Sequence, residues 1–500
     1  MNKLREHLNL IIGKTQIPKW LAILLGIIIV LRIPSLFEPF YYGDETIYLT
    51  LGNGIKKGLV LYQQIYDNKP PLLYLTAAIA GNVFWFKAIL LLWNMITVTI
   101  FWHLSKLFFS GKEKIIKIAT IIFGVLTSIP MFEGNIANAE LFMIGPIILA
   151  IFLLFKEKSS WINKLIAGVL FAIAALYKMP AAFDLPAIIV FWLITNGFTK
   201  EGIKKSLKDT LLLLIGFAIP LIGSFIYFFF KGAVLDYLFA AYLQNFGYLS
   251  SWREGSQGGS LLNNLPLIIR GSIVIAGILV LYIKRKILSK EFLFICIWLL
   301  FGLFAVALSE RPYPHYLIQV VPEISLLLGI LIADKTIKQS LVVIPLLLAF
   351  SVPVIYKFWY YPSTSYYAKF IKFSLGIKNR AEYFSSFGKY VNHNYELADF
   401  IGNATAPDEK IFVWGPESPN IYSLSRRLPP SKYVADYHFF DYADMKKEAD
   451  IIINAKPSFI IVLSNSRPYP ELTSQIKKHY YQISDTNGSE IWRIRRIPLK

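Results

Sequence analysis

Side chains suited to acid–base chemistry meet in one short stretch near the start of the 500-residue chain. Adjacent carboxylates, Asp44 and Glu45, follow Gly43, and a lysine followed by a proline, Lys69 and Pro70, comes 25 residues after Asp44. A positioned carboxylate can accept the proton of a hydroxyl group, which contributes roughly 10²–10⁴-fold to a reaction rate. A fixed lysine cation can compensate the negative charge of a leaving group such as a phosphate. These residue types could therefore support general-base chemistry beside an anion.

The same residues also have purely structural interpretations. Ile47, Tyr48 and Leu51 follow Asp44 at helical spacing, which predicts an amphipathic helix with Asp44 as its N-cap. Lys69 could lie along an apolar surface with its ammonium in water. Neither interpretation explains why two acids, several tyrosines, a lysine and two prolines share one loop.

The chain around this loop is dominated by long apolar segments. Hydrophobic residues make up 55% of the sequence and charged residues 17%, whereas globular domains average roughly 25% charged residues. A bilayer-spanning helix needs about 20 mostly apolar residues. We therefore expect a polytopic α-helical membrane protein with about eleven spanning helices. The expected ranges are 20–37, 84–108, 116–131, 140–156, 162–178, 183–197, 209–230, 265–283, 291–308, 315–334 and 340–357.

Lysines and arginines cluster in every second connection between these segments. Counted together with the adjoining helix ends, and with ambiguous helix-end charges left out, the connections on the N-terminal side of the membrane hold 21 of these residues and the opposite connections hold 7. By the positive-inside rule, the N-terminus is cytoplasmic, and the loops 38–83 and 231–264 and the tail after residue 357 are extracytoplasmic. This distribution accounts for the net charge of +19 without nucleic acid binding. No small-residue cleavage site follows the first apolar segment, so that segment is expected to be retained as a membrane helix.

The tail, residues 358–500, is polar and mixed in charge. Its short apolar runs, bounded by polar and turn residues, predict buried strands, and helical patterns lie between them. The sequence therefore predicts two domains, a membrane domain over 1–357 and an extracytoplasmic α/β domain over 358–500. The expected strands are Ile411–Trp414, Phe459–Leu463 and Ser489–Ile494, and the expected helices are Tyr395–Ile401, Met445–Ala455 and Glu471–Tyr480.

The first-loop pattern resembles one known family. Gly43-Asp44-Glu45, then Tyr48, then Lys69 followed by two prolines and a leucine is similar to the C-type integral membrane glycosyltransferases, especially their protein O-mannosyltransferase and aminoarabinose-transferase branch. The resemblance covers residues 20–357 in topology. Weaker similarities are Asn138-Ala139-Glu140 and the stretch 311–316.

The resemblance implies an enzyme of the cell membrane with the C-type fold. It would move a hexose or pentose, with inversion, from a polyprenyl-phosphate carrier among the membrane lipids to an acceptor hydroxyl of a protein, lipid or glycan. It implies that Asp44 is the catalytic carboxylate with Glu45 beside it, and that Lys69 contacts the carrier phosphate.

Other residues of the outside loops are candidates for supporting roles. Lys178, Arg253 and Arg311 are further cations for the donor phosphate, and Glu140 occupies the place of the family's second acid. Metal use is left open: the sequence identifies no required cofactor, and His315 with Glu140, Asp44 and Glu45 could hold a divalent metal ion. The expected lining of the substrate cavity is Tyr48, Tyr62, Tyr66, Pro70, Tyr313 and Tyr316.

Three other functions compete with a monophosphate-sugar transferase. A ligase of oligosaccharides or polymers would use a lipid diphosphate, which the Lys-Pro-Pro motif disfavours. A lipid or sugar transporter usually carries ionisable groups near mid-membrane and repeated halves, and neither is evident in the sequence. An assembly protein that binds a partner through the tail would need no acid and lysine directed at one site.

Overall fold

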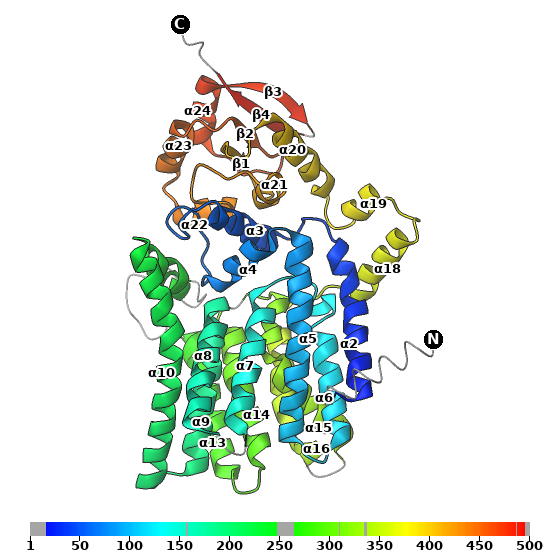
Figure 1. The fold of residues 1–500 in the computed structure, drawn as a ribbon, viewed down its shortest axis with the longest axis vertical. Coiled ribbons are helices and arrows are strands. Elements are labelled where there is room, and N and C mark those ends of the chain that lie inside the picture. The colour runs from blue at the N-terminus through cyan, green and yellow to red at the C-terminus, as the bar shows by residue number, and fades with distance from the viewer. Residues whose placement is uncertain are drawn as a thin grey trace. The chain divides into compact units, whose positions relative to one another are not determined.

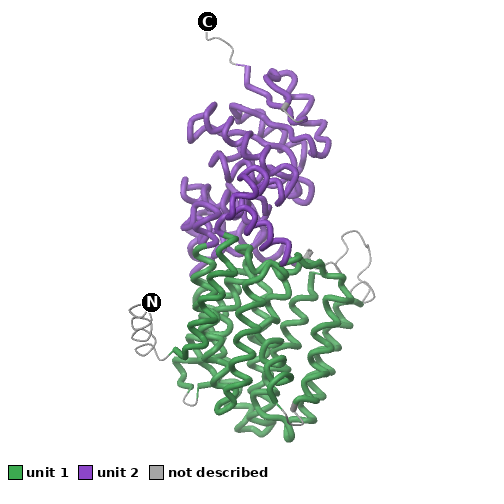
Figure 2. The backbone as a smooth tube through the Cα atoms, turned by 90° about the vertical axis from the view of Figure 1, so that its right-hand side faces the viewer, with its two compact units in different colours: residues 1–35, 88–222, 247–363 green, residues 36–87, 223–246, 364–500 purple. Residues whose placement is uncertain are grey.

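The computed structural model describes residues 17–156, 159–247, 265–309, 311–334, 338–486 and 488–495. The chain forms two compact units (Figure 2). Unit 1 consists of residues 1–35, 88–222 and 247–363, and unit 2 of residues 36–87, 223–246 and 364–500. The first long loop therefore belongs to the same unit as the tail, together with residues 223–246, which include the end of helix α10 (Lys200–Phe230).

Unit 1 is a bundle of helices that run side by side (Figure 1). Short 3₁₀ turns join several of them, η1 (Ile33–Phe37), η2 (Pro130–Phe132), η3 (Met179–Phe183) and η6 (Pro314–Val320). The helices are α2 (Lys19–Arg32), α5 (Val83–Phe108), α6 (Glu113–Leu126), α7 (Ala139–Phe155), α8 (Trp161–Tyr177), α9 (Asp184–Asn196), α10 (Lys200–Phe230), α13 (Leu265–Lys284), α14 (Lys290–Ala307), α15 (Val321–Ala333), α16 (Lys338–Leu341) and α17 (Val343–Ile355).

The described part of the chain contains seven helical segments long and apolar enough to cross a bilayer. They are Lys19–Phe37, Val83–Phe108, Met179–Asn196, Lys200–Phe230, Leu265–Lys284, Lys290–Ala307 and Pro314–Ala333. Shorter apolar helices are Ala139–Phe155, Trp161–Tyr177, Val234–Leu243 and Gln339–Ile355. Each of the eleven predicted segments coincides with a helix, so the prediction of a polytopic helical membrane protein is confirmed.

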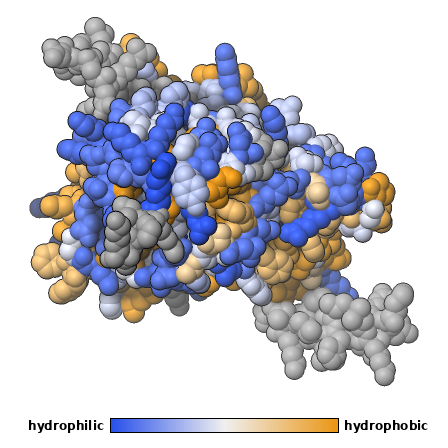
Figure 3. All heavy atoms as spheres, turned by 90° about the horizontal axis from the view of Figure 1, so that it is seen from above, coloured by the Kyte–Doolittle hydropathy of each residue, from blue (hydrophilic) through white to orange (hydrophobic). Residues whose placement is uncertain are grey.

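The surfaces of the helices agree with a lipid environment. Isoleucines and leucines of α10 and α13, such as Ile222, Ile275 and Ile283, are more than half exposed. Such large apolar faces are not stable in water. Helix α14 is buried along almost its whole length from Phe292 to Ala307, which makes it the centre of the bundle. By contrast, Figure 3 shows a face of the molecule on which hydrophilic residues gather.

The tail forms a four-stranded sheet in the order β1-β2-β4-β3. Strands β1 (Ile411–Trp414) and β2 (Phe459–Val462) are parallel, and β4 (Ser489–Ile494) pairs antiparallel with β2 and with β3 (Tyr480–Thr486). The three predicted strands are confirmed, and β3 is additional. The helices of the tail are α18 (Ser363–Ser374), α19 (Arg380–Ser385), α20 (Val391–Ala404), α21 (Ser418–Ser425), α22 (Asp436–Tyr442), α23 (Met445–Asn454) and α24 (Pro470–His479).

The first loop contributes two helices to unit 2, α3 (Gly43–Lys56) and α4 (Leu72–Ala80). They touch backbone to backbone, because a Cβ atom added at Gly52 would lie 2.6 Å from the nitrogen of Ala78. Two prolines precede α4, as suits a helix start, and Gly81 ends it in the left-handed conformation. The segment after α10 adds α11 (Val234–Leu238), a π-helical turn η4 (Phe239–Leu243) and α12 (Gln244–Gly247).

Candidate active site

Asp44 and Lys69 lie side by side in unit 2. Helix α3 begins at Gly43 with Tyr42 as its N-cap, so Asp44 stands in the first turn and is not the N-cap that the sequence suggested. An acidic side chain in the first turn interacts favourably with the helix dipole. The Lys69 Nζ atom is 3.7 Å from the Asp44 Oδ2 atom, and the two side chains are 22% and 32% exposed. The pair is therefore accessible to a ligand.

Tyr48, one turn further along α3, contacts both members of the pair. Its hydroxyl donates a hydrogen bond of 2.8 Å to the Asp44 Oδ2 atom, and the Lys69 ammonium lies 5.0 Å from the centre of its ring. Burial and then the Asp44 carboxylate raise the pKa of Tyr48 well above its usual value, so Tyr48 remains a neutral donor. Within the described residues the Asp44 Oδ1 atom accepts no hydrogen bond. That oxygen can accept one from an incoming hydroxyl group.

Two tyrosines fix the backbone of Lys69. The Tyr62 hydroxyl donates to the Lys69 carbonyl oxygen at 2.8 Å, and the Lys69 N–H donates to the Tyr74 hydroxyl at 3.0 Å. Tyr62 itself has a positive φ of 72°, and its ring stacks on that of Tyr237 at 5.3 Å. The lysine backbone is thus held on both sides while its ammonium stays partly exposed.

Asp67 is a second carboxylate beside Lys69 and was not predicted as a site residue from the sequence. Its Oδ2 atom lies 3.8 Å from Lys69 Nζ, and its side chain is 1% exposed. Burial alone would raise the pKa of Asp67, but Lys69 and His438 outweigh it and hold that pKa below its usual range. Asp67 is therefore a charged group that shares the Lys69 ammonium with Asp44.

Glu45, the neighbour of Asp44 in sequence, belongs to a different cluster. Its Oε2 atom is 3.2 Å from Lys87 Nζ, which also contacts the carboxylate of Glu38. The Tyr366 hydroxyl donates to the other oxygen of Glu38. The charged side chains of this cluster are at most 2% exposed. The sequence predicted that Glu45 acts beside Asp44. The structure instead directs Glu45 to Lys87 and Glu38, away from the Asp44–Lys69 pair.

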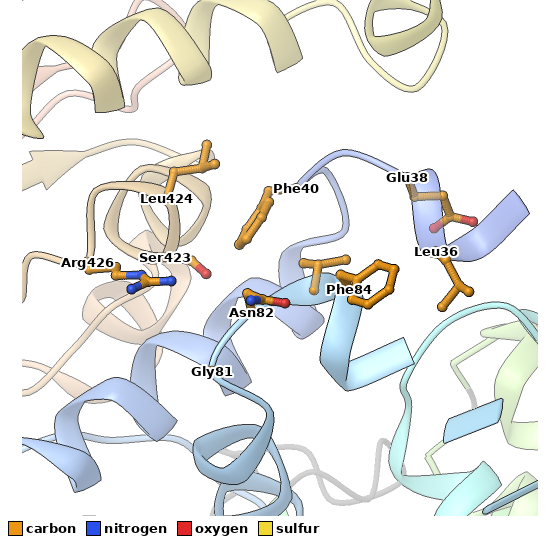
Figure 4. A pocket seen from close by; sticks show the side chains of 10 residues that line it. Leu36, Glu38, Phe40, Gly81, Asn82, Phe84, Ser423, Leu424 and Arg426 are labelled. Atoms are coloured by element: carbon orange, nitrogen blue, oxygen red, sulfur yellow. The ribbon is translucent and has the colours of Figure 1, made fainter. Parts of the chain in front are cut away.

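Glu38 also borders a cavity of about 360 Å³ in unit 2. Figure 4 shows Arg426 and Ser423 of the tail beside Asn82, with Phe40 and Glu38 further along the wall. Neither Asp44 nor Lys69 lines this cavity. The cavity belongs to the surroundings of the buried cluster and is separate from the accessible pair.

A third group of charged side chains lies in unit 1. Glu140 forms an ion pair with Lys178, whose ammonium also lies 3.7 Å from the centre of the Tyr316 ring. The His315 Nδ1 atom contacts Glu133, and its Nε2 atom is 3.9 Å from Glu140 Oε1. Three of the predicted site residues, Glu140, Lys178 and His315, are thus brought together. Glu133 was not predicted.

Comparison with known proteins gives matches at the level of structure only. No protein family profile matches the sequence, and no curated protein does. The crystal structure of ArnT from Cupriavidus metallidurans bound to undecaprenyl phosphate matches with a TM-score of 0.56 and 15% identity, over 95% of this chain and 97% of that chain. Its apo state matches with a TM-score of 0.54 and 14% identity over the same shares.

This chain has the fold of ArnT. The similarity spans almost the full length of both proteins, so the ArnT fold includes the membrane bundle and the α/β tail. The C-type fold expected from the first-loop motif is therefore confirmed. The Archaeoglobus fulgidus oligosaccharyltransferase in complex with Zn and sulfate matches more weakly, with a TM-score of 0.47 and 15% identity, over 96% of this chain and 74% of that one.

The predicted site residues are divided between the two units. Unit 2 holds Asp44, Lys69, Tyr48, Tyr62, Tyr66 and Pro70, and unit 1 holds Glu140, Lys178, His315, Tyr313 and Tyr316. The Tyr313 ring stacks on His315 at 5.6 Å. Arg311 is exposed, and Arg253 lies outside the described residues.

The carboxylates of the described residues do not fit a metal site. Among the described residues, no three side chains of His, Cys, Asp or Glu are placed to hold a metal ion together. In unit 1, the Lys178 ammonium already compensates Glu140, and His315 contacts Glu133. We therefore derive no step through a metal.

Proposed function

We propose that this chain is an inverting glycosyltransferase that moves a sugar from a polyprenyl-phosphate carrier to an acceptor hydroxyl group. The observation that carries the proposal is the accessible Asp44–Lys69 pair, with 3.7 Å between Oδ2 and Nζ, on the fold of ArnT. The ArnT structure that matches was bound to undecaprenyl phosphate, which is a lipid phosphate of the proposed kind.

In the proposed reaction, Asp44 acts on the acceptor hydroxyl group and Lys69 acts on the phosphate of the donor. The acceptor hydroxyl transfers its proton to Asp44, and its oxygen forms a bond to the anomeric carbon of the sugar. The bond between that carbon and the phosphate oxygen breaks, and the carrier phosphate leaves with the bonding electron pair. Lys69 stabilises the negative charge on the phosphate. One base and one displacement invert the anomeric centre.

The resting contacts of Lys69 suit this sequence of events. Its ammonium is shared by two carboxylates at 3.7 and 3.8 Å, which are longer than the 2.7–2.9 Å of a charge-assisted hydrogen bond. A phosphate can therefore attract the ammonium without breaking a tight pair. Asp44 is then left with Tyr48 as its hydrogen-bond donor and can accept the proton of the acceptor.

The proposed location follows from the distribution of basic residues in the sequence. We place the protein in the plasma membrane with a cytoplasmic N-terminus, and we place the first loop and the α/β tail after residue 357 on the extracytoplasmic side. The donor sugar is a hexose or pentose, and the acceptor is a protein, lipid or glycan. In this arrangement Glu45, Glu38 and Lys87 support the loop, and Asp44 and Lys69 act on the substrates.

Transfer from defined donors tests the proposal. Purified protein is incubated with radiolabelled polyprenyl-phosphate sugars and membrane extract, and labelled acceptor is measured. We expect transfer by the parent, loss of transfer by Asp44→Asn, and parental activity in Asp485→Asn, which alters an exposed acid of the tail. Absence of transfer from every such donor would refute the proposal, and so would parental activity in Asp44→Asn. Transfer only from lipid diphosphates would instead identify a ligase.

Labelling of introduced cysteines tests the orientation. A cysteine placed after residue 400 should react with a membrane-impermeant reagent from outside intact cells. Reaction only after the cytoplasmic side is exposed would reverse the proposed orientation and remove the first loop from the extracytoplasmic face.

A further inference from the structure

A short part of the tail, residues 432–442, contacts the loop that carries Lys69. The Tyr66 N–H donates to the Lys432 carbonyl oxygen at 2.9 Å, and Tyr66 and Tyr433 form an isolated parallel β-bridge. The tail therefore holds this loop by its backbone. The Tyr66 ring also meets three tail rings at centroid distances of 5.2 to 5.7 Å, those of Tyr433, His438 and Tyr442.

His438 is the polar member of this contact. Its Nε2 atom lies 3.4 Å from the Asp67 Oδ1 atom, and both side chains are 1% exposed. This separation exceeds that of an ordinary hydrogen bond, so the contact is mainly electrostatic. The Nδ1 atom on the other side of the ring is buried and makes no hydrogen bond within the described residues. A buried imidazole with unsatisfied nitrogens costs stability, so packing alone does not explain its place against Asp67.

Asp67 links the histidine to Lys69. Its Oδ1 atom accepts from the Asn68 N–H at 2.8 Å, and its Oδ2 atom accepts from the Tyr74 hydroxyl at 2.9 Å. The same Oδ2 atom lies 3.8 Å from the Lys69 ammonium. Each oxygen of the Asp67 carboxylate thus accepts a hydrogen bond. Asp67 and Asp44 are the two carboxylates that attract the Lys69 ammonium, so the position of Asp67 influences where that ammonium lies.

We propose that His438 is a positioning residue, supplied by the tail, that fixes Asp67 and through it the ammonium of Lys69. The proposal rests on the proposed function for the role of Lys69 at the donor phosphate. His438 does not itself touch the reacting atoms. Because a misplacement of about 1 Å can cost roughly 10²-fold in rate, removal of this support has a measurable effect on catalysis.

Substitution of His438 with two different side chains tests the role. His438→Phe keeps an aromatic ring but removes both nitrogens, and His438→Gln keeps an amide donor of similar reach. We expect His438→Phe to lower kcat/KM for the donor about 10–100-fold and His438→Gln to restore most of it. The matched control, His479→Gln, changes an exposed histidine of the tail and should match the parent. A folded His438→Phe protein with the parental kcat/KM would overturn the proposal.

Combination with Asp67→Asn tests whether the two residues act as a unit. If His438 acts only through Asp67, the double variant should lose no more activity than Asp67→Asn alone. Losses that multiply would show that His438 acts elsewhere and would overturn the proposal. If His438→Phe does not fold, His438→Asn takes its place, since its shorter amide does not reach Asp67.

The reactivity of Lys69 gives a measurement that does not depend on transfer. The Lys69 side chain is 22% exposed, so an amine-reactive reagent can label it, and peptide mass spectrometry can follow the rate. His438→Phe should label Lys69 faster than the parent because the ammonium is less firmly held, whereas His479→Gln should not. Equal rates in folded His438→Phe would contradict the positioning role. If the parent transfers no sugar, the proposed function fails, while this measurement still decides the role of His438.

Discussion

Unit 2 contains two clusters that each combine two carboxylates with one lysine but differ in how far these side chains are exposed to solvent. Asp44 and Asp67 share Lys69, and Glu38 and Glu45 share Lys87, so each cluster has two carboxylates and one lysine. In the first cluster Asp44 and Lys69 are 32% and 22% exposed and only Asp67 is buried, at 1%, whereas all charged side chains of the second cluster are at most 2% exposed. Composition alone therefore does not distinguish a reactive cluster from a structural one.

Burial explains the difference. A charge removed from water needs a close partner, because the desolvation penalty amounts to several kcal/mol per ion. Lys87 accordingly contacts both glutamates closely, and it cannot leave them for a ligand. An exposed ion pair contributes only about 0–1 kcal/mol, so Lys69 can exchange Asp44 for a phosphate at little cost. The accessible cluster is suited to catalysis, and the buried one is suited to holding α3 against the first residues of α5, which belong to unit 2.

The largest expected difference in kcat is between variants of the two adjacent acids, Asp44 and Glu45. Asp44→Asn should lower kcat about 10²–10⁴-fold by removing the base. Glu45→Gln keeps an oxygen for Lys87 and removes the excess negative charge, so its kcat should stay within about threefold of the parent. Steady-state transfer rates of both proteins test this. If Glu45→Gln is as inactive as Asp44→Asn while still folded, the division into two clusters is wrong.

The two lysines should separate activity from stability. Lys87→Met leaves two buried carboxylates without a cation and should lower the free energy of unfolding by about 3–5 kcal/mol. Lys69→Met removes a cation from Asp44, which water can solvate, and from the buried Asp67, so it should lower the free energy of unfolding by about 1–3 kcal/mol, less than Lys87→Met does. The same Lys69→Met protein should lose about 10²–10³-fold in kcat. Thermal unfolding in one detergent and transfer rates on the same samples give both quantities, and equal destabilisation by the two variants would contradict the comparison.

The contact between α3 and α4 should determine the geometry of the accessible cluster. A Cβ atom at Gly52 would lie 2.6 Å from the backbone of Ala78, whereas one at Gly54 would meet the flexible end of Ile65 at 2.7 Å. Gly52→Ala should therefore cost about 1–3 kcal/mol of stability and reduce transfer. Gly54→Ala, the matched control, should cost less. Thermal unfolding of the two variants tests this order of stability. If Gly54→Ala is the less stable variant, α3 and α4 can move apart to accept a Cβ atom at position 52.

The smallest expected effect is at Tyr48, the neutral partner of the accessible cluster. Tyr48→Phe removes the 2.8 Å hydrogen bond to Asp44, which contributes about 1 kcal/mol. Because Asp44 is partly exposed, water can replace the hydroxyl. We expect kcat to fall about fivefold with little change in the KM for the donor, measured with the same transfer assay. A loss as large as that of Asp44→Asn would mean that Tyr48 takes part in proton transfer.

The sequence predicted the membrane helices and most of the sheet because both depend on local patterns. Long apolar runs and short buried strands such as Ile411–Trp414 are visible without any tertiary information. Strand β3 was missed because Tyr480–Thr486 is largely polar and exposed; it exists because its backbone pairs with β4.

The site was only partly predictable for a related reason. Asp44 and Lys69 flank one loop and form a recognisable pattern. Lys87 lies inside an apolar span, and its partner Glu38 precedes it by 49 residues, so no local pattern marks the pair. His438 lies in a tail helix without any motif, and only the folded contact with Asp67 reveals it. Glu45 had the residue type and spacing of a catalytic acid, but its direction on α3 could not be read from the sequence.

The β-bridge between Tyr66 and Tyr433 also has a consequence for the timing of biosynthesis. The two strands of the bridge are separated by roughly 370 residues, and a chain grows by about 5–20 residues per second. The ribosome therefore takes tens of seconds between the two halves of the contact. During that interval the loop has its lysine but not the tail that holds it. A nascent or truncated chain that lacks residues 432–442 should therefore hold the Lys69 loop less firmly than the complete chain does.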